Sequence, residues 1–272
     1  MGGSRGVLEK ILASKRGEIA RGRPSVSGTI TYEPGGLVFQ TLRRLPGQPL
    51  RLIAEIKPRS PSAGQLSTVI RVAERARAYA EAGASMISVL VDGPFFGGSY
   101  EDLKLARETL DEIYGAGRPR LLCKEFILDA GQLDWARGAG ADAVLLIARI
   151  VSAEKLEELV NEAHVRDLEA LVEVTTAEEW RIAEMTNAKI IGVNARDLDT
   201  LEMNHERAAE VLSHIDGERV RVHLSGLVLP DDIARMTRGC ADAALVGEAL
   251  MREDDPRELL REMVERAGGT PT

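Results

Sequence analysis

The segment RVAERARAYAEAGASMISVLV (residues 71–91) contains one complete unit of the repeating pattern that decides the fold. In its first part, residues 71–83, apolar and small residues recur at helical spacing. Its second part, residues 85–91, is a run of apolar and small residues that is too short for a buried helix. We therefore interpret the segment as an amphipathic helix followed by a buried strand.

Seven further runs of this kind occur along the chain. They are RLIAEI (51–56), RLLCKEF (120–126), DAVLLIA (142–148), EALVEV (169–174), KIIGVN (189–194), VRVHLSG (220–226) and DAALVG (242–247). Segments with helical periodicity, such as PDDIARMTRG (230–239), separate them, which indicates a parallel sheet with helices outside. Eight units, none followed by a GxGxxG motif, favour a closed barrel over a doubly wound sheet.

We predict an α/β fold, a (β/α)8 TIM barrel with an N-terminal helical extension, in a single domain of 272 residues. Such a barrel typically takes ~250 residues. Residues 1–50 form the extension packed on the barrel, with helices over 7–23 and around 37–45 and an irregular Ser/Gly/Pro stretch between them. Residues 51–266 form the barrel, and residues 267–272 a loose tail.

Composition excludes several classes of protein. A formal net charge of -8 and a pI near 5.3 argue against a nucleic-acid partner, which usually needs a basic surface. No apolar run approaches the roughly 18 residues of a membrane span, and the polar start lacks a signal peptide. Cys123 and Cys240 lack metal-ligand spacing, so we expect free thiols, no metal, and a cytoplasmic protein. We expect a monomer or a weak homo-oligomer.

Charged and polar residues gather where the predicted strands end, which is where barrel enzymes carry their catalytic groups. They are Glu55, Lys57, Lys124, Glu173, Asn194, Arg196, Ser225, Gly226, Gly247 and Glu248. One such charge more often marks where solvent begins, but Glu55 and Lys57 point to the same side of one strand and the others converge on the same rim. Two lysines and two glutamates in one mouth can supply a general acid and a general base.

The turns after the seventh and eighth runs predict a phosphate site. Ser225-Gly226 and Gly247-Glu248 leave backbone N–H groups free, and in many barrels this corner binds a phosphate. Arg59 and Ser60 are available from the loop after the first strand. Plain turns are the alternative interpretation of the two glycines.

Six motifs resemble, in order from about residue 50 to 260, those of the indole-3-glycerol-phosphate synthase family. They are IAEIKPRSPSAG (53–64), CKEF (123–126), GADAVLLIA (140–148), LVEV (171–174), IGVNARDL (191–198) and ALVGEALMREDDP (244–256). The resemblance implies a carboxy-lyase of tryptophan biosynthesis that needs no cofactor. Its substrate, 1-(2-carboxyphenylamino)-1-deoxyribulose 5-phosphate, closes a ring with loss of carbon dioxide and water to give indole-3-glycerol phosphate.

The resemblance also implies roles for residues. Lys124 is similar to the family's general acid toward the substrate carbonyl, and Lys57 to the lysine that pairs with the anthranilate carboxylate and shares acid duties. Glu173 resembles the general base for dehydration, and Glu55 an orienting carboxylate. Asn194 and Arg196 resemble the residues that contact the sugar hydroxyls. The family-like positions for an apolar slot around the anthranilate ring are Pro61, Phe96, Phe126, Leu145 and Leu201, for which ordinary packing is the alternative.

The chain departs from the family pattern at the end of the seventh strand, where Leu224-Ser225-Gly226 stands in place of Glu-Ser-Gly. Leucine accepts neither a proton nor a hydrogen bond, so a mouth carboxylate is missing, at a cost on the order of 1–3 kcal/mol if that group orients the substrate. Val91 stands where threonine is common, Glu125 replaces an aspartate, and Arg59 stands where lysine is found.

Two other functions are open. A relative of the family acting on another phosphosugar or carbonyl substrate would keep the phosphate corner and use a lysine for Schiff-base chemistry. A binding protein without turnover is less consistent with Lys57, Lys124 and Glu173. Phosphoribosylanthranilate isomerase is rejected because it relies on a Cys/Asp pair at strand ends, whereas the first strand here ends in Glu55 and Lys57.

Overall fold

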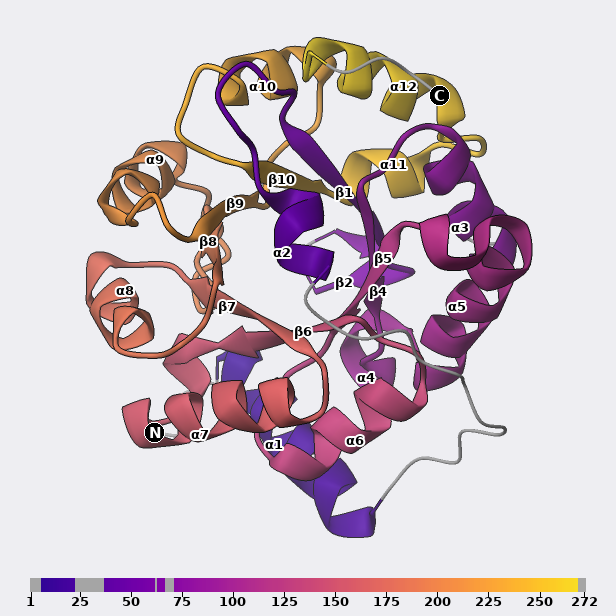
Figure 1. Cartoon of the computed structure of the whole chain (residues 1–272). Helices are drawn as coiled ribbons and strands as arrows, with labels where there is room; N and C mark the ends of the chain where they lie inside the picture. The colour runs from indigo at the N-terminus through magenta and orange to yellow at the C-terminus, as the bar shows by residue number, and fades with distance from the viewer. Residues whose placement is uncertain (1–5, 23–36, 62, 67–70, 269–272) are drawn as a thin grey trace.

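The computed structural model describes residues 6–22, 37–61, 63–66 and 71–268. Eight parallel strands close into a barrel in the order β1-β10-β9-β8-β7-β6-β5-β4, and helices surround it (Figure 1). The strands are β1 (Arg51–Ile56), β4 (Met86–Leu90), β5 (Arg120–Lys124), β6 (Ala143–Ile147), β7 (Glu169–Val174), β8 (Ile190–Asn194), β9 (Val220–Leu224) and β10 (Ala243–Val246). The predicted (β/α)8 barrel is confirmed.

Every barrel strand is followed by at least one helix, and for the first seven strands this helix precedes the next strand of the barrel. The helices are α3 (Val72–Glu81), α4 (Gly93–Phe96), α5 (Tyr100–Tyr114), α6 (Ala130–Gly138), α7 (Ala153–Val165), α8 (Ala177–Glu184), α9 (His205–His214), α10 (Pro230–Met236), α11 (Glu248–Arg252) and α12 (Arg257–Arg266). Ser99, Ser152 and Thr176 cap α5, α7 and α8 by accepting a backbone N–H in the first turn. A short ribbon of β2 (Arg59–Ser60) and β3 (Gly64–Gln65), which sequence patterning did not predict, follows β1.

The eight predicted strands all form, and most are one or two residues shorter than the apolar runs suggest. Asp142 and Asp242 directly precede β6 and β10, and their side chains accept hydrogen bonds from the backbone N–H groups of Leu121 and Arg221 on the neighbouring strands. Their own backbone N–H groups donate to the carbonyls of the same two residues. Each aspartate therefore fixes the start of its strand against the strand before it.

Side chains of alternating parity divide the core into two layers. Ile53, Met86, Leu122, Leu171 and Val222 point into the barrel and belong to one buried apolar cluster. The residues between them in sequence pack against the outer helices in a second, larger cluster. The inward positions continue toward the carboxyl ends of the strands, so residues of this parity there face the mouth of the barrel.

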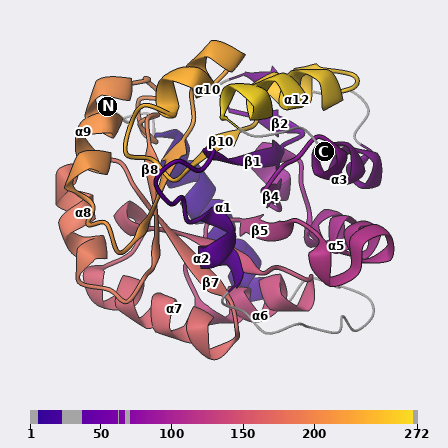
Figure 2. The same ribbon diagram turned by 45° about the horizontal axis from the view of Figure 1, so that its top comes forward.

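The two N-terminal helices contact opposite ends of the barrel. Val38 and Leu42 of α2 (Leu37–Leu42) join the interior cluster at the amino ends of the strands, and α2 lies at the centre of the ring of helices (Figure 1). Leu8 and Ile11 of α1 (Val7–Arg21) join it at the carboxyl ends, where they line the mouth. Both predicted helices are thus confirmed, whereas the Ser/Gly/Pro stretch between them falls on residues 23–36, outside the described residues. Figure 2 shows the helices around the barrel in a tilted view.

Ion pairs and backbone hydrogen bonds hold two aspartates, Asp142 and Asp242, at the amino end of the barrel. Arg118 forms a fork on Asp142, with Nη–Oδ distances of 2.6 and 2.8 Å. Asp242 accepts from the backbone N–H of Arg44 and from both the backbone and the guanidinium of Arg221. The carboxylate of Asp242 is buried and that of Asp142 is partly exposed, and each oxygen has a partner.

The packed structure extends one residue past the predicted start of the tail. Ala267 is buried, and its carbonyl accepts a hydrogen bond from the backbone N–H of Leu50, so the loose tail cannot begin at 267. Residues 269–272 lie outside the described residues. In the described part of the chain, no helix is long and apolar enough to cross a bilayer.

Candidate functional site

A cavity opens at the carboxyl ends of the strands, and the structure brings all but one of the predicted site residues to its wall. They are Glu55, Lys57, Ser60, Pro61, Phe96, Lys124, Phe126, Leu145, Glu173, Asn194, Arg196, Leu201, Leu224, Ser225, Gly226, Gly247 and Glu248. The exception is Arg59, whose guanidinium donates hydrogen bonds to the backbone carbonyls of Gly93 (2.9 Å) and Pro94 (2.7 Å) in α4. Arg59 thus joins two loops of the rim.

Glu55 and Lys57 of the first strand form an ion pair at the cavity wall, with 3.0 Å between Nζ and Oε1. Burial opposes the charge of Glu55, but the ammonium groups of Lys57 and Lys124 outweigh it and hold the pKa of this carboxyl below its ordinary value. A Cβ at Gly247 would lie 2.6 Å from Glu55 Oε1, so only glycine leaves room for this carboxylate beside β10. Glu55 is therefore a buried carboxylate held in its charged form.

Lys124, Glu173 and Asn194 come from β5, β7 and β8, of which the last two are neighbours. Asn194 Nδ2 donates to Glu173 Oε1 at 2.9 Å, which fixes the plane of the carboxylate. Glu173 Oε2 lies 3.6 Å from Lys124 Nζ and has no hydrogen-bond partner within the described residues, although the side chain is buried. A buried carboxylate oxygen without a partner is able to accept a proton, and a partly exposed ammonium beside it is able to donate one.

The loop after β8 is folded around Arg196. Its backbone N–H donates to Asn194 Oδ1, its guanidinium donates to the carbonyl of Leu201, and it forms an isolated β-bridge with Met203. Leu201 has a φ of +63°, a left-handed conformation that is strained for leucine. The loop is thus closed on itself beside Glu173, where it presents Arg196 and Leu201 to the cavity.

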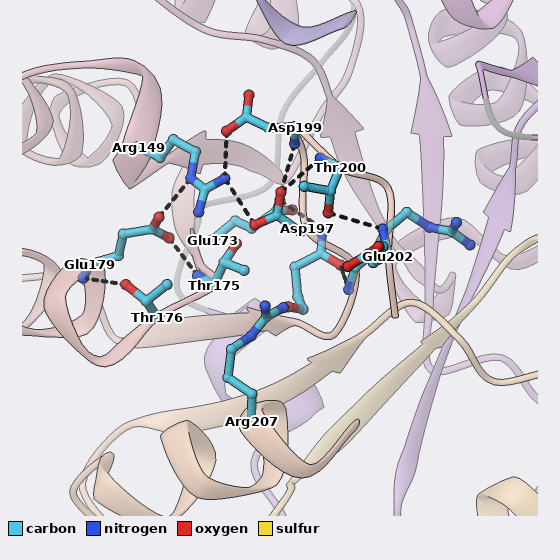
Figure 3. Close-up of polar contacts among 12 residues, drawn as sticks. Arg149, Glu173, Thr175, Thr176, Glu179, Asp197, Asp199, Thr200, Glu202 and Arg207 are labelled. Atoms are coloured by element: carbon cyan, nitrogen blue, oxygen red, sulfur yellow. Dashed lines mark hydrogen bonds and ion pairs between the residues drawn. The ribbon is translucent and has the colours of Figure 1, made fainter. Parts of the chain in front are cut away.

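Arg149 ties this loop to α8, as Figure 3 shows. Its guanidinium donates to Glu179 at 2.7 Å, to Asp199 at 3.1 Å and to Asp197 at 3.3 Å. Asp197 also accepts from the backbone N–H groups of Thr200 and Asp199; these bonds, chiefly that of Thr200, and the charge of Arg149 lower its pKa. This network holds the loop from outside the cavity.

Part of the cavity lining is apolar. The rings of Phe96 and Phe126 lie 5.9 Å apart at an interplanar angle of 33°, and Leu145 of β6 and Leu245 of β10 also line the cavity. Leu224 is buried, and its side chain leans over Gly192, where a Cβ would lie 2.6 Å from Cδ1 of Leu224. The position that lacks the expected carboxylate is therefore filled by close apolar packing.

The residues of the predicted phosphate corner lie at the cavity. Ser225 and Gly226 both have left-handed φ values, +71° and +82°, so the chain turns sharply as β9 ends. Gly247, which follows the neighbouring strand β10, and Ser60 line the same cavity.

Sequence reasoning missed the contribution of α1 to the site. Val7, Leu8 and Ile11 line the cavity, and Lys15, one turn beyond Ile11, is buried among carboxylates. Its Nζ lies 2.8 Å from Glu125, 3.1 Å from Asp92 and 2.6 Å from Glu18. A lysine that continues the apolar stripe of an amphipathic helix was the available signal.

This ion cluster gives the departure at Glu125 a structural role. Burial raises the pKa of Glu125 from its ordinary value of 4.5 to about 7, although Lys15 acts in the opposite direction. Burial likewise opposes the charge of Lys15, but Glu125 and its other partners raise the pKa of Lys15 above its ordinary value. The other departure on this side, Val91, is buried in the layer between barrel and helices.

The described residues contain no group of three or more His, Cys, Asp or Glu side chains placed to hold a metal ion. Cys123 and Cys240 are both free thiols. The residues that line the cavity thus carry ammonium, guanidinium, carboxylate, amide, hydroxyl and apolar side chains.

Sequence comparisons agree on one family. The sequence model of the indole-3-glycerol phosphate synthase family matches residues 8–263. An indole-3-glycerol phosphate synthase of Nocardioides sp. is 42% identical over 212 residues, which cover 78% of this chain and 79% of that protein. One from Listeria monocytogenes is 40% identical over 249 residues, 92% of this chain and 94% of that protein. A multifunctional tryptophan biosynthesis protein of Schizosaccharomyces pombe is 38% identical over 95% of this chain, which spans 35% of its length.

Solved structures support the fold. Thiamine phosphate pyrophosphorylase from Pyrococcus furiosus superposes with a TM-score of 0.61 at 19% identity, covering 80% of this chain and 96% of that one. The 3-hexulose-6-phosphate synthase of Salmonella typhimurium gives 0.61 at 14% identity, with 80% and 98% covered. At these identities the likeness concerns the barrel alone.

Proposed function

Since the chain belongs to the indole-3-glycerol phosphate synthase family, we propose that the cavity at its barrel mouth carries out that family's ring closure. The substrate is 1-(2-carboxyphenylamino)-1-deoxyribulose 5-phosphate, and the products are indole-3-glycerol phosphate, carbon dioxide and water. The observation that carries the assignment of roles is the unpartnered oxygen of buried Glu173, 3.6 Å from Lys124 and fixed by Asn194.

In the first step, the carbon of the anthranilate ring that bears the carboxylate attacks the ketone carbon of the sugar. Lys124 Nζ donates a proton to the ketone oxygen, so a hydroxyl forms as the carbon–carbon bond closes. Lys57 holds the substrate carboxylate, and Glu55, which pairs with Lys57 at 3.0 Å, keeps this ammonium in place. Loss of carbon dioxide then returns the bonding electron pair to the ring.

In the second step, the new hydroxyl leaves as water. Glu173 Oε2 removes the proton whose loss forms the ring double bond, while a lysine ammonium protonates the departing hydroxyl. Asn194 holds Oε1 and thereby aims Oε2 at the cavity. Arg196 and Asn194, fixed by the closed loop after β8, contact the sugar hydroxyls.

The two ends of the substrate fit the two remaining parts of the wall. The anthranilate ring packs against the edges of Phe96 and Phe126 and against Leu145, Leu201 and Pro61. The phosphate binds the backbone of the turns at Ser225-Gly226 and Gly247-Glu248, with Ser60 beside them. The substrate thus spans the cavity with its reacting atoms beside the four charged side chains.

Turnover of the substrate tests the proposal directly. Indole fluorescence appears when the substrate is added to the wild type, and we expect none with Lys124→Ala. Lys189→Ala, which removes an exposed lysine at the amino end of β8, is the matched control and keeps full activity. Fluorescence that persists in Lys124→Ala would remove Lys124 from the acid role.

The alternative, a family relative that uses Lys57 or Lys124 for Schiff-base chemistry on another carbonyl substrate, rests on the apolar packing at Leu224. Borohydride trapping discriminates the two. A covalent adduct on either lysine with a candidate phosphosugar would favour the alternative, and synthase turnover without an adduct would exclude it.

We also propose that the protein acts in the cytoplasm as a monomer or a weak homo-oligomer. The thiol of Cys123 is buried and free, and Cys240 is free, as expected in a reducing compartment. Size-exclusion chromatography with light scattering tests the oligomeric state, and a tight dimer at micromolar concentration would contradict it.

A further inference from the structure

A buried histidine lies directly behind the turn that forms the phosphate corner. His223 is 1% exposed, and its Nε2 lies 3.1 Å from the backbone carbonyl oxygen of Ser225. The inward positions of β9 are Val220, Val222 and Leu224, so His223 faces away from the cavity, into the layer between barrel and helices. A histidine in this place takes no part in the proton transfers described above.

The contact with Ser225 fixes the hydrogen-bonding state of the ring. A carbonyl oxygen only accepts, so His223 must carry its proton on Nε2 and donate it to Ser225. Burial, together with the nearby His205, lowers the pKa of His223 to about 4, so the ring is neutral near pH 7. Its Nδ1 has no hydrogen-bond partner in the described part of the chain, which agrees with a single neutral tautomer.

The direction of one carbonyl sets the direction of the next N–H group. No peptide bond is cis in the described chain, and across a planar trans peptide the C=O and the following N–H point in opposite directions. The carbonyl of Ser225 points outward to His223, so the N–H of Gly226 points the other way, toward the cavity that Gly226 lines. The hydrogen bond also stabilises Ser225 at its φ of +71°, which is unfavourable for a non-glycine residue.

A second histidine and a methionine also pack against this turn. The ring of His205 stacks on that of His223, with centroids 5.7 Å apart and an angle of 15°. A Cβ on Gly226 would lie 2.5 Å from Cε1 of His205 and 2.2 Å from Cε of Met203. The turn is therefore held both by a polar contact, to His223, and by close packing, against His205 and Met203.

We propose that His223 is a positioning residue of the anion site: by holding the carbonyl of Ser225 it aims the N–H of Gly226 at the substrate's phosphate. That the bound anion is the substrate's phosphate rests on the function proposed above. The direction of the Gly226 N–H would favour any tetrahedral oxyanion at this turn. The contribution is one of binding, so it affects KM and phosphate affinity and leaves proton transfer untouched.

Two variants of His223 separate the hydrogen bond from the space that the ring fills. His223→Leu removes the donor, and His223→Gln keeps an N–H donor in place of Nε2. We expect His223→Leu to raise the dissociation constant for inorganic phosphate, and KM, about tenfold, with kcat within about twofold, and His223→Gln to restore most of the affinity. His214→Leu, an exposed histidine at the end of α9, is the matched control and leaves both values unchanged. Unchanged phosphate affinity in a folded His223→Leu variant would overturn the proposal.

A measurement on the wild type keeps the proposal testable if His223→Leu does not fold. Nitrogen-15 NMR of the histidine rings should show the Nε2–H tautomer for His223, and titration with inorganic phosphate should shift the amide resonance of Gly226. A ring protonated at Nδ1 would overturn the proposal. Neither the ring NMR nor the phosphate titration needs the proposed substrate. Both therefore remain informative if the wild type fails to turn that substrate over, a result that would refute the proposed function and not this proposal.

Discussion

The two ends of the barrel both bury charged side chains, but they satisfy them differently. At the amino end, both oxygens of Asp142 and of Asp242 accept hydrogen bonds from arginine side chains or from backbone N–H groups. Glu169, also at the amino end, keeps one oxygen without a hydrogen-bond partner among the described residues, but it lies outside the cavity. At the carboxyl end, one oxygen of Glu173 likewise has no hydrogen-bond partner among them, and the ammonium of Lys124 is 3.6 Å away. An unpartnered carboxylate is therefore available to a substrate only at the carboxyl end, where it faces the cavity.

The largest expected effect is a loss of activity from a change at the carboxyl end. Glu173→Gln removes the base, and we expect kcat to fall by a factor on the order of 10²–10⁴ while the free energy of unfolding stays nearly constant. Steady-state kinetics and urea unfolding measure the two quantities.

Glu169→Gln is the matched control for this variant. Glu169 begins the same strand, β7, at the amino end, and burial raises the pKa of its carboxyl, but it lies outside the cavity. We expect full activity. An equal loss of kcat in Glu173→Gln and Glu169→Gln would contradict a specific role for Glu173 as the base.

The next largest effect is a loss of stability from a change at the amino end. Asp142→Asn removes the charge that Arg118 and the backbone of Leu121 bind, and we expect a loss of about 4 kcal/mol in the free energy of unfolding with kcat unchanged. Asp167→Asn, which alters an exposed ion pair of 3.7 Å with Arg137, should cost less than about 0.5 kcal/mol. A fall of kcat in a folded Asp142→Asn variant would contradict the division between the two ends.

Glu125 sharpens the comparison, because it is a partnered charge at the carboxyl end. Its pKa is about 7 in the folded protein against an ordinary value of 4.5, so the folded state retains this proton to higher pH than the unfolded state. The corresponding stabilisation is complete below pH 4.5 and lost as the pH rises through 7, a change of about 3 kcal/mol.

Glu125→Gln removes this titration. Urea unfolding at pH 4.5 and pH 8 should show that the wild type loses more stability than the variant between the two values. The same pH dependence in both proteins would exclude Glu125 as the titrating group.

The smallest expected effect concerns Leu224, an apolar residue of the mouth. Leu224→Glu supplies the carboxylate that β9 lacks, and we expect kcat/KM to rise by up to about tenfold while burial of the charge lowers the free energy of unfolding by about 1–3 kcal/mol. Leu224→Gln, which accepts a hydrogen bond without a charge, should give a smaller gain. A loss of activity in both variants would mean that the packing of Leu224 against Leu171 and Gly192 shapes the substrate site.

The barrel and its charged mouth could be predicted because both depend on local patterns. Apolar runs define the strands, and the parity of Glu55, Lys57, Lys124 and Glu173 within them directs these side chains inward. The barrel topology then brings them together whatever the loops do. The hydrogen bonds that the side chains of Asp142 and Asp242 accept could not be predicted, because the donors lie on a neighbouring strand.

Long-range contacts explain the rest of what sequence reasoning missed. Lys15 meets Glu125 across 110 residues of chain, so no local pattern links them. Arg59 donates to the backbone carbonyls of Gly93 and Pro94 and does not line the cavity. The direction of a backbone carbonyl cannot be predicted from residue types. His223 escaped notice for the same reason, since its partner is the carbonyl of Ser225.

The position of α2 across the amino end of the barrel has a consequence for the order in which the chain folds during synthesis. Arg44, which follows α2, binds Asp242, Ala241 and Thr237, and Asp242 is made 198 residues later. The strand pair that closes the barrel joins residues 51–54 to 243–246. A chain that leaves the ribosome amino end first therefore holds α2 without these partners until its last strand emerges. Closure of the barrel and docking of this segment then become a single late event.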